Sequence, residues 1–238
     1  MKNLLFLAGC FLASFSAVAQ EKIVVDENVT PRDIEKFVAV EVSGGIDLYI
    51  SQSNEIALAV SASEKKLVPY LKTEVKDGVL RIYAEKGMKS FNRIGKPLKA
   101  YISAPVLHRI SASGACDVLI SGVLKQDDLE INLSGSSDFK GTLEVKNLAV
   151  HQSGSSDSFL AGKAQHAKLE VSGASDIKAY GLETEYCKAS ASGASDIQIS
   201  VNKEIAASAS GASDIYFKGS ATAKDIKQSG ASTVARRS

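Results

Sequence analysis

The chain of 238 residues contains no tryptophan, and it has only 8 phenylalanines and 7 tyrosines. Three of the phenylalanines, Phe6, Phe11 and Phe15, lie at the extreme N-terminus. A core assembled from the rest of the chain therefore has few large rings to fill it. The sequence predicts a thin interior built from Ile, Val, Leu and Ala.

An excess of charge of one sign is also missing, because 28 basic side chains nearly balance 27 acidic ones. A balanced chain gives no electrostatic reason to expect nucleic acid or an anionic lipid surface as a partner. With 45% hydrophobic and 23% charged residues, the composition is that of a globular protein and not that of a disordered one.

Residues 1–19 have the features of a signal peptide. Lys2 provides a short positive segment, residues 4–17 are almost wholly apolar, and Ala17-Val18-Ala19 is a small-x-small cleavage site. The apolar run is short for a membrane-spanning helix, so we expect no transmembrane segment in the mature chain. Leu7-Ala8-Gly9-Cys10 supports a second interpretation, a bacterial lipoprotein acylated at Cys10. Both interpretations predict export to the periplasm, the outer cell surface or the medium.

A five-residue motif, Ser-Gly followed by two small residues and Asp, recurs along the second half of the chain. Successive motif glycines are separated by 21, 19, 19, 20, 18 and 19 residues. A period of this length is typical of a solenoid, in which each repeat buries its apolar face against its neighbours. The copies begin at Ser113, Ser134, Ser153, Ser172, Ser192, Ser210 and Ser229, and the last has Thr233 in place of the aspartate.

Apolar residues alternate with polar ones on both sides of the motif. Ile131 and Leu133 precede one motif glycine, and Val118 and Ile120 follow another. This spacing of two is that of a β-strand, and no segment after Ser111 has helical spacing over a useful length. The sequence predicts an all-β fold, a parallel β-helix or β-solenoid with coils of about 19 residues. Second glycines predict a further corner of the coil at Gly122, Gly162, Gly181 and Gly219.

Residues 20–110 fit the same architecture in a less regular form. Gly44, Gly45, Ile46 and Asp47 follow alternating valines and match the later turns, but the next motif glycine lies 70 residues further on. That distance is not a whole number of coils, so an insertion is expected. It would comprise a helical turn at residues 64–71, a hairpin at Asp77-Gly78 and an exposed basic loop at residues 86–97. Residues 111–238 form the regular part of one continuous domain.

These features together resemble a known family. The signal peptide, Gly44-Gly45-Ile46-Asp47, Leu67-Val68-Pro69-Tyr70-Leu71, Asp77-Gly78-Val79-Leu80 and the repeated coils look like the bacterial auto-transporter adhesin family named for its head GIN domain. The resemblance covers essentially the whole mature chain, although the GIN tripeptide is Gly45-Ile46-Asp47 here. It implies a secreted or surface protein of a kind common in Bacteroidetes. It also implies a single-stranded right-handed β-helix with an adhesin-like role.

The motif aspartates are the strongest candidates for binding residues in the sequence. In stacked coils their carboxylates would lie about 5 Å apart and repel each other by about 1 kcal/mol in water. In a structural interpretation, each accepts hydrogen bonds from turn N–H groups and serines. In the alternative a row of calcium ions binds, but one carboxylate per coil supplies few of the roughly 6 to 8 oxygens that calcium needs, so we predict no metal. The candidate binding residues are Asp117, Asp138, Asp157, Asp176, Asp196 and Asp214, and Asp47 is the equivalent residue in the family-motif turn.

Two cysteines, Cys116 and Cys187, remain in the predicted mature chain. They occupy different positions in their repeats and lie about three coils apart, which separates them by roughly 15 Å. A disulfide requires Cα atoms within about 7 Å. We therefore predict two free thiols.

The sequence offers little support for catalysis. His108, His151 and His166 occupy different repeat positions, so no Ser-His-Asp assembly is indicated. A glycan-active β-helix enzyme, a lyase or hydrolase, is the alternative. Such enzymes usually have long loops that wall a groove, whereas the coils here have 18 to 21 residues. We predict a non-catalytic, exported module without a cofactor that binds a surface glycan or protein.

The last repeat differs from the others at the open end of the solenoid. The position six residues after its glycine is Arg236 instead of an apolar residue, and Arg237 follows. Charge at a strand edge discourages the addition of a strand from a second molecule. We interpret the two arginines as edge protection, with a frayed tail as the other interpretation.

Overall fold

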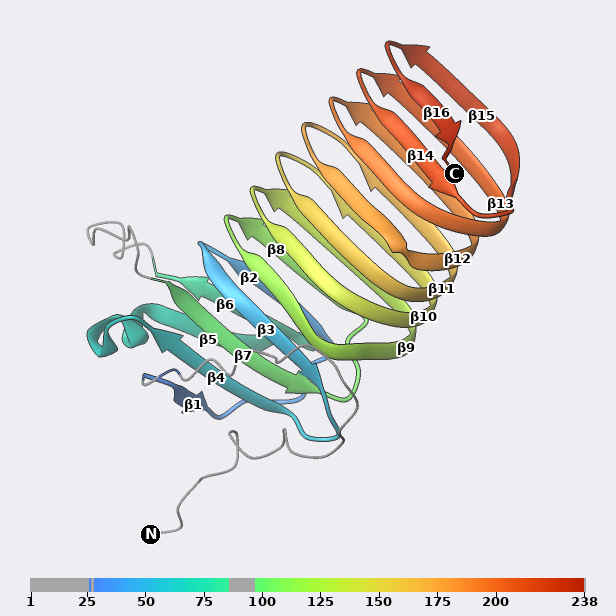
Figure 1. Cartoon of the computed structure of the whole chain (residues 1–238). Coiled ribbons are helices and arrows are strands. Elements are labelled where there is room, and N and C mark those ends of the chain that lie inside the picture. The colour runs from blue at the N-terminus through green and yellow to red at the C-terminus, as the bar shows by residue number, and fades with distance from the viewer. Residues whose placement is uncertain (1–25, 27, 86–96, 238) are drawn as a thin grey trace.

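The structure is a computed structural model that describes residues 26, 28–85 and 97–237. The predicted signal peptide, Cys10 and nearly all of the predicted basic loop lie outside these residues. Within the described ranges the one helical element is a short 3-10 helix, η1 (Lys65–Tyr70), and every other element is a strand. The prediction of an all-β solenoid is confirmed (Figure 1).

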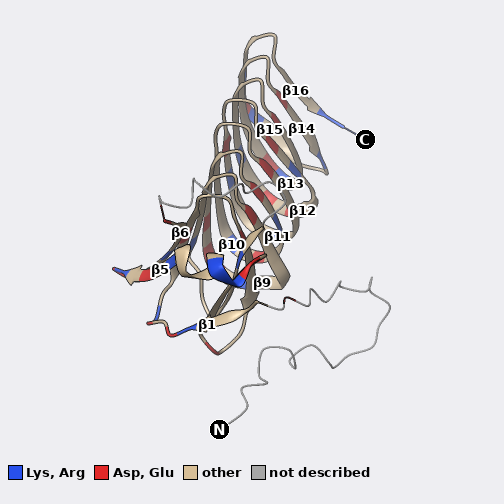
Figure 2. Cartoon of the chain, turned by 90° about the vertical axis from the view of Figure 1, so that its left-hand side faces the viewer, with Lys and Arg blue, Asp and Glu red and all other residues tan. Residues whose placement is uncertain are grey.

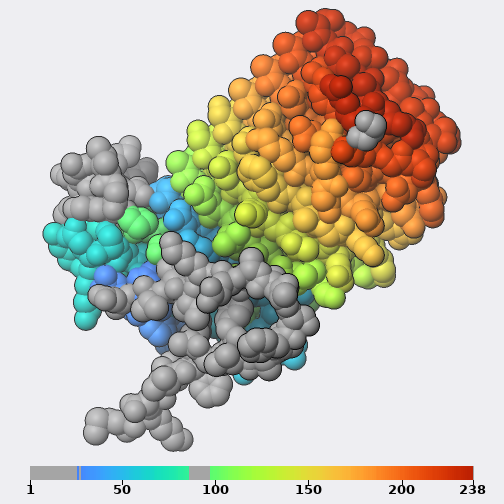
Figure 3. Space-filling model, viewed as in Figure 1, coloured from blue at the N-terminus to red at the C-terminus, as the bar shows by residue number. Residues whose placement is uncertain are grey.

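Five long strands form the regular part of the solenoid, and each winds through about one coil. They are β9 (Asp117–Gly135), β10 (Asp138–Gln152), β11 (Asp157–Val171), β12 (Asp176–Gly193) and β13 (Asp196–Gly211). The C-terminal end is formed by β14 (Asp214–Lys218), β15 (Thr222–Gly230) and β16 (Thr233–Arg236). Each coil pairs in parallel with the next, and the coils stack in chain order along a rod (Figures 1 and 3). The right-handed sense stays a prediction.

Every coil contributes to two parallel sheets. The segments that follow the motif turns, such as residues 117–121, form what we call the aspartate sheet. The segments that lead into the turns, such as residues 129–135, form the serine sheet. A shorter third side joins the two sheets. It begins at predicted corners, and three of the glycines there have a positive φ: +77° at Gly122, +104° at Gly162 and +95° at Gly219.

Side chains alternate between the interior and the surface along each strand, as the sequence predicts. Val118, Ile120 and Leu133 are buried, and in the coils of β12 and β13 small alanines take the inward positions of the serine sheet. Phe139 is a fully buried exception to the thin interior. Gly141 makes room for it, because a Cβ on Gly141 would lie 3.1 Å from the Phe139 ring and 2.7 Å from the Ile120 side chain.

The N-terminal coils do not stack in chain order. The coil of β2 (Ala39–Ser43) and β3 (Ile46–Gln52) pairs on one side with β8 (Arg109–Gly114) and β9. On its other side it pairs with β6 (Val79–Ala84) and β7 (Leu98–Ala104), which come later in the chain than β3. A later segment therefore lies outside an earlier one. This explains why Gly44 and Gly114 are not separated by a whole number of coils.

Antiparallel strands cover this end of the solenoid. β5 (Leu71–Lys76) forms a hairpin with β6, and the φ values of Asp77 and Gly78 in its turn are +52° and +74°, as a type I′ turn requires. β4 (Ala57–Ala62) pairs with β7, and β1 (Thr30–Arg32) pairs with β4. The helix η1 buries Leu67 and Val68 against the same core.

Polar side chains close the C-terminal end. Arg236 is the register partner of the buried Phe217. Its guanidinium carbon lies 5.2 Å from the centroid of the Phe217 ring, and its nitrogens donate hydrogen bonds to the carbonyl oxygens of Gly219 and Ala221. Because β16 pairs with β14 in parallel, the frayed-tail interpretation is wrong for residues 233–236.

Candidate functional site

The motif turn is explained by the contact between one coil and the next. Gly154 has a φ of +86°, and a Cβ there would lie 2.4 Å from the carbonyl oxygen of Gly135 in the preceding coil. The same close approach recurs at the other motif glycines from Gly135 onward. Only glycine satisfies both the positive φ and this distance, so the glycine of the motif is a requirement of stacking.

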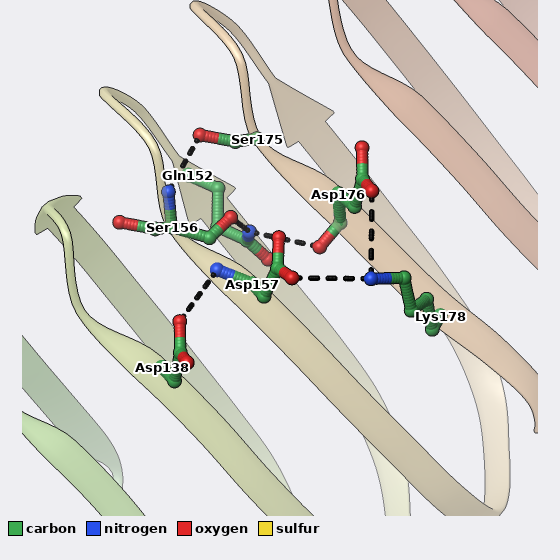
Figure 4. A network of polar contacts seen from close by, with 7 residues as sticks. All are labelled: Asp138, Gln152, Ser156, Asp157, Ser175, Asp176 and Lys178. Atoms are coloured by element: carbon green, nitrogen blue, oxygen red, sulfur yellow. Dashed lines mark hydrogen bonds and ion pairs between the residues drawn. The ribbon is translucent and has the colours of Figure 1, made fainter.

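The serine before each motif aspartate is also structural. Ser156 is fully buried, and its Oγ donates to the carbonyl oxygen of Ser153 at 3.2 Å and accepts the N–H of Ser137 at 3.3 Å. Ser156 in turn donates its own N–H to the Oγ of Ser175 at 3.1 Å (Figure 4). We call this set the buried serine ladder: Ser137, Ser156, Ser175, Ser195 and Ser213.

The motif aspartates form the predicted column on the outer face of the aspartate sheet. Adjacent members are register partners, as with Asp117 and Asp138, or Asp176 and Asp196. The Oδ1 of Asp138 accepts the N–H of Asp157 at 3.1 Å (Figure 4), and the Oδ1 of Asp196 accepts the N–H of Asp214 at 3.1 Å. The expected backbone donors are therefore present at these positions, but they belong to the next coil and not to the same turn.

Charge is unevenly compensated along this column. Lys178 pairs with Asp157 at 3.1 Å and with Asp176 at 3.5 Å (Figure 4), whereas Asp117 and Asp138 make no ion pair with any described residue. Burial raises the pKa of Asp117, and the charge of Asp138 adds to that shift. Burial and the charge of Asp117 likewise raise the pKa of Asp47. Acidic segments recur from coil to coil in Figure 2.

The described part of the chain contains no set of side chains suited to the calcium alternative. No group of three or more His, Cys, Asp or Glu side chains within it could hold a metal ion. Each coil contributes one carboxylate to the column, as the sequence indicates.

Aromatic rings beside the aspartate column contact side chains of neighbouring coils. Tyr49 and Tyr101 stack with their centroids 5.0 Å apart. The Nζ of Lys178 lies 5.0 Å from the centroid of the Phe159 ring, and Arg237 lies 4.0 Å from that of Tyr216. One face of each of these rings therefore contacts a side chain one coil away, and Phe159 stays 43% exposed.

The serine sheet carries a groove of about 820 Å³ on its outer face. Its lining reaches from β6 to β13 and includes Arg81 and Tyr83 at one end. What we call the serine column holds the first serine of the first six motif copies and its equivalent in β2: Ser43, Ser113, Ser134, Ser153, Ser172, Ser192 and Ser210. The mixed column, two residues earlier in each coil, also lines the groove: Glu41, Ser111, Asn132, His151, Glu170, Ser190 and Ser208.

The charged groups of the groove are already paired. Glu41 lies 3.3 Å from Arg81 and 3.6 Å from Arg109. The Nδ1 of His151 lies 2.8 Å from Glu170, which also pairs with Lys168 at 2.8 Å. The hydrogen bond from Lys168, with a contribution from His151, lowers the pKa of Glu170. The groove therefore presents hydroxyl, amide and imidazole groups without an uncompensated carboxylate.

The histidines do not come together. His108 and His166 line a second groove of about 650 Å³, where His166 stacks on Tyr186 with centroids 5.0 Å apart. His151 lies in the first groove.

The prediction of two free thiols is confirmed, because Cys116 and Cys187 are both buried and unbridged. Burial raises the pKa of the Cys187 thiol to about 12.

The groove was missed from the sequence. The serine that precedes each motif glycine is as regular as the aspartate, and this regularity is the signal that could have found it. From the sequence, those serines are part of the repeat motif and have no predicted binding role, although they line the groove on the serine sheet.

Comparison with known proteins agrees with this architecture. The model of the family described as "Putative auto-transporter adhesin, head GIN domain" matches residues 36–221. The chain belongs to this family. The resemblance identified from the sequence is therefore confirmed. The family is described as putative adhesins, and this description names no ligand.

Solved structures of related proteins share the fold. A putative adhesin from Bacteroides fragilis is 27% identical, with a TM-score of 0.79, and the match covers 88% of this chain and 96% of that one. A putative adhesin from Parabacteroides merdae is 21% identical, with a TM-score of 0.65 and coverage of 88% and 95%. A putative lipid binding protein from Parabacteroides distasonis is 20% identical, with a TM-score of 0.69 and coverage of 88% and 96%. The comparison with curated proteins found no match.

No helix among the described residues has the length and apolar character to span a bilayer.

Proposed function

We propose that the protein is an exported, non-catalytic surface module that binds a neutral glycan in the groove of the serine sheet. Membership of an adhesin family supports a binding role. The signal-peptide features of residues 1–19 support export.

The observation that carries the proposal is the hydroxyl-lined groove itself. A glycan offers many hydroxyl groups that both donate and accept hydrogen bonds, and serine hydroxyls do the same. Since Glu41 and Glu170 are engaged in ion pairs, the groove has no free charge with which to prefer an ionic ligand. Its volume of about 820 Å³ is sufficient for an oligosaccharide.

The carboxylates of this groove do not have the spacing expected of a glycan-cleaving enzyme. Glycosidases place two carboxyl groups about 5 to 9.5 Å apart across the scissile bond. Glu41 and Glu170 are separated by four coil spacings in the mixed column, which is roughly 19 Å. Both carboxylates also form ion pairs with basic side chains, and a separation of this size does not fit the two-carboxylate mechanism.

The aspartate column is a second candidate surface. Asp117 and Asp138 lack ion-pair partners among the described residues, and their carboxylates face solvent. In this second proposal they accept hydrogen bonds from a hydroxylated or cationic ligand. The double variant Asp117→Asn/Asp138→Asn would then lose binding. Retention of full affinity would exclude the aspartate column as the binding surface.

A glycan array followed by a turnover assay tests the main proposal on the protein that starts at Gln20. We expect binding to neutral glycans and no release of shortened products. Failure to retain any glycan would overturn the proposal, and cleavage of a bound polysaccharide would overturn its non-catalytic part.

A further inference from the structure

We propose that the ligand is a linear neutral glycan that lies parallel to the solenoid axis, with successive sugars on successive coils. This inference rests on the proposed function and goes beyond it, because it specifies the chain form, direction and length of the ligand.

The groove repeats along one direction only. Ser113 and Ser134 are register partners in adjacent coils, and so are Ser192 and Ser210. Neighbouring strands in a sheet lie about 4.8 Å apart, so the serine column offers one hydroxyl at each such step. An extended hexose chain advances by a similar length with each sugar. The same contact can therefore be repeated along the whole chain.

The hydroxyls of the serine column are available for a ligand. The Oγ atoms of Ser134, Ser192 and Ser210 make no hydrogen bond with another described residue, whereas Ser172 contacts the carbonyl oxygen of Gln152 at 3.4 Å. In the two last coils of the groove, Ser190 and Ser208 add a second hydroxyl per coil beside Ser192 and Ser210. The protein therefore leaves hydrogen-bonding capacity unused along the groove.

A glycan that crossed the groove would meet different chemistry. The next outward position beyond the mixed column is charged in four coils, at Arg109, Glu130, Lys168 and Lys188, and is alanine at Ala149 and Ala206. Lys168 is paired with Glu170, and Arg109 is paired with Glu41. A chain that crossed at one of the four charged coils would have to displace a long side chain, whereas an axial chain contacts the groove floor throughout. The axial direction is therefore favoured.

The test is a length series of soluble neutral oligosaccharides, drawn from whichever of the cello-, xylo- and manno-series the array retains. We expect the association constant to rise with each added sugar until the chain approaches seven units, one for each member of the serine column in the groove. A tryptophan at Ser153, an exposed position in the middle of the column, would divide the groove into two short halves. In Ser153→Trp the longest oligosaccharide should bind no better than a trimer.

Lys140→Trp provides the matched control, because Lys140 is exposed and lies on the aspartate sheet. It should leave the length dependence unchanged. Equal affinity for a disaccharide and a heptamer would overturn the axial arrangement and leave glycan binding intact. Loss of the length dependence in Lys140→Trp but not in Ser153→Trp would also overturn it. Binding to no glycan of any length would instead overturn the proposed function.

Discussion

The backbone N–H of Cys116 donates a hydrogen bond to the Oγ of Ser137, 3.3 Å away in the next coil. Cys116 therefore occupies the first rung of the buried serine ladder. Its own Sγ accepts the N–H of Ile46 at 3.4 Å and lies 3.3 Å from the carbonyl oxygen of Ser113. Cys116, which the sequence predicts only to be a free thiol, takes the place of this serine where the regular coils meet the β2–β3 coil.

This position gives a first prediction. Cys116→Ser should leave stability nearly unchanged, because a hydroxyl can make the same contacts. Cys116→Ala should cost about 1–3 kcal/mol, because it leaves the buried N–H of Ile46 without an acceptor. Urea unfolding of the two variants measures the difference. Equal stability of the serine and alanine variants would show that the thiol contributes no hydrogen bond.

A second prediction separates two roles of glycine. Gly154 and Gly122 have similar φ values, +86° and +77°, but a Cβ would meet a carbonyl oxygen at 2.4 Å on Gly154 and nothing within 4 Å on Gly122. Gly122→Ala should cost about 1–2 kcal/mol for the left-handed conformation alone. Gly154→Ala should cost about 4 kcal/mol or more, because two coils must also move apart. Equal melting temperatures of the two variants in thermal unfolding would contradict this account.

The regular coils could be predicted because their pattern is local. The period, the alternation and the Asp77-Gly78 turn each lie within a few residues, and all three appear in the structure. The position of β6 and β7 outside β2 and β3 could not be predicted, since it depends on long-range pairing of β2 with β6 on one side and with β8 on the other. The groove was missed for a related reason. A sequence shows which residues share a column, but not which face of the solenoid is hollowed.

A third prediction concerns pH. Partial desolvation, with the charge of Asp138, raises the folded-state pKa of Asp117, so the folded protein holds this proton more tightly than the unfolded chain. The contribution of Asp117 to stability is therefore most favourable below the unfolded pKa of about 3.9. It is lost as pH rises through the higher folded pKa. Asp117→Asn should thus stabilise the protein at pH 7, and the gain should disappear as pH falls to about 3.

Asp26→Asn is the contrasting control. Burial acts to raise the pKa of Asp26, but hydrogen bonds from Ser61 at 2.6 Å, from the N–H of Asn28 and from Tyr101 at 3.1 Å outweigh it and lower the pKa. This substitution should destabilise the protein at pH 7 and have less effect at low pH. Urea unfolding across the pH range measures both variants. A destabilised Asp117→Asn protein at pH 7 would contradict the assignment of repulsion to the aspartate column.

The last prediction concerns the C-terminal end of the solenoid, where β15 and β16 have no further coil beside them in the structure. Exposed strand edges pair readily with a second molecule. Arg236 opposes this in two ways, because its guanidinium covers the Phe217 ring and occupies the carbonyl oxygens of Gly219 and Ala221. Arg237 contacts the outward-facing Tyr216 ring instead.

Arg236→Val should therefore increase end-to-end association and cost about 1 kcal/mol in stability, since it removes a cation–π contact and hydrogen bonds at an exposed site. Arg237→Val is the matched control and should change association much less, because the carbonyl oxygens of Gly219 and Ala221 keep their partner. Sedimentation velocity over a range of protein concentrations distinguishes the two variants. If Arg236→Val stays as monodisperse as the parent at high concentration, the arginine does not protect the edge. If Arg237→Val associates to the same extent, net positive charge and not the specific cover over Phe217 keeps the molecules apart.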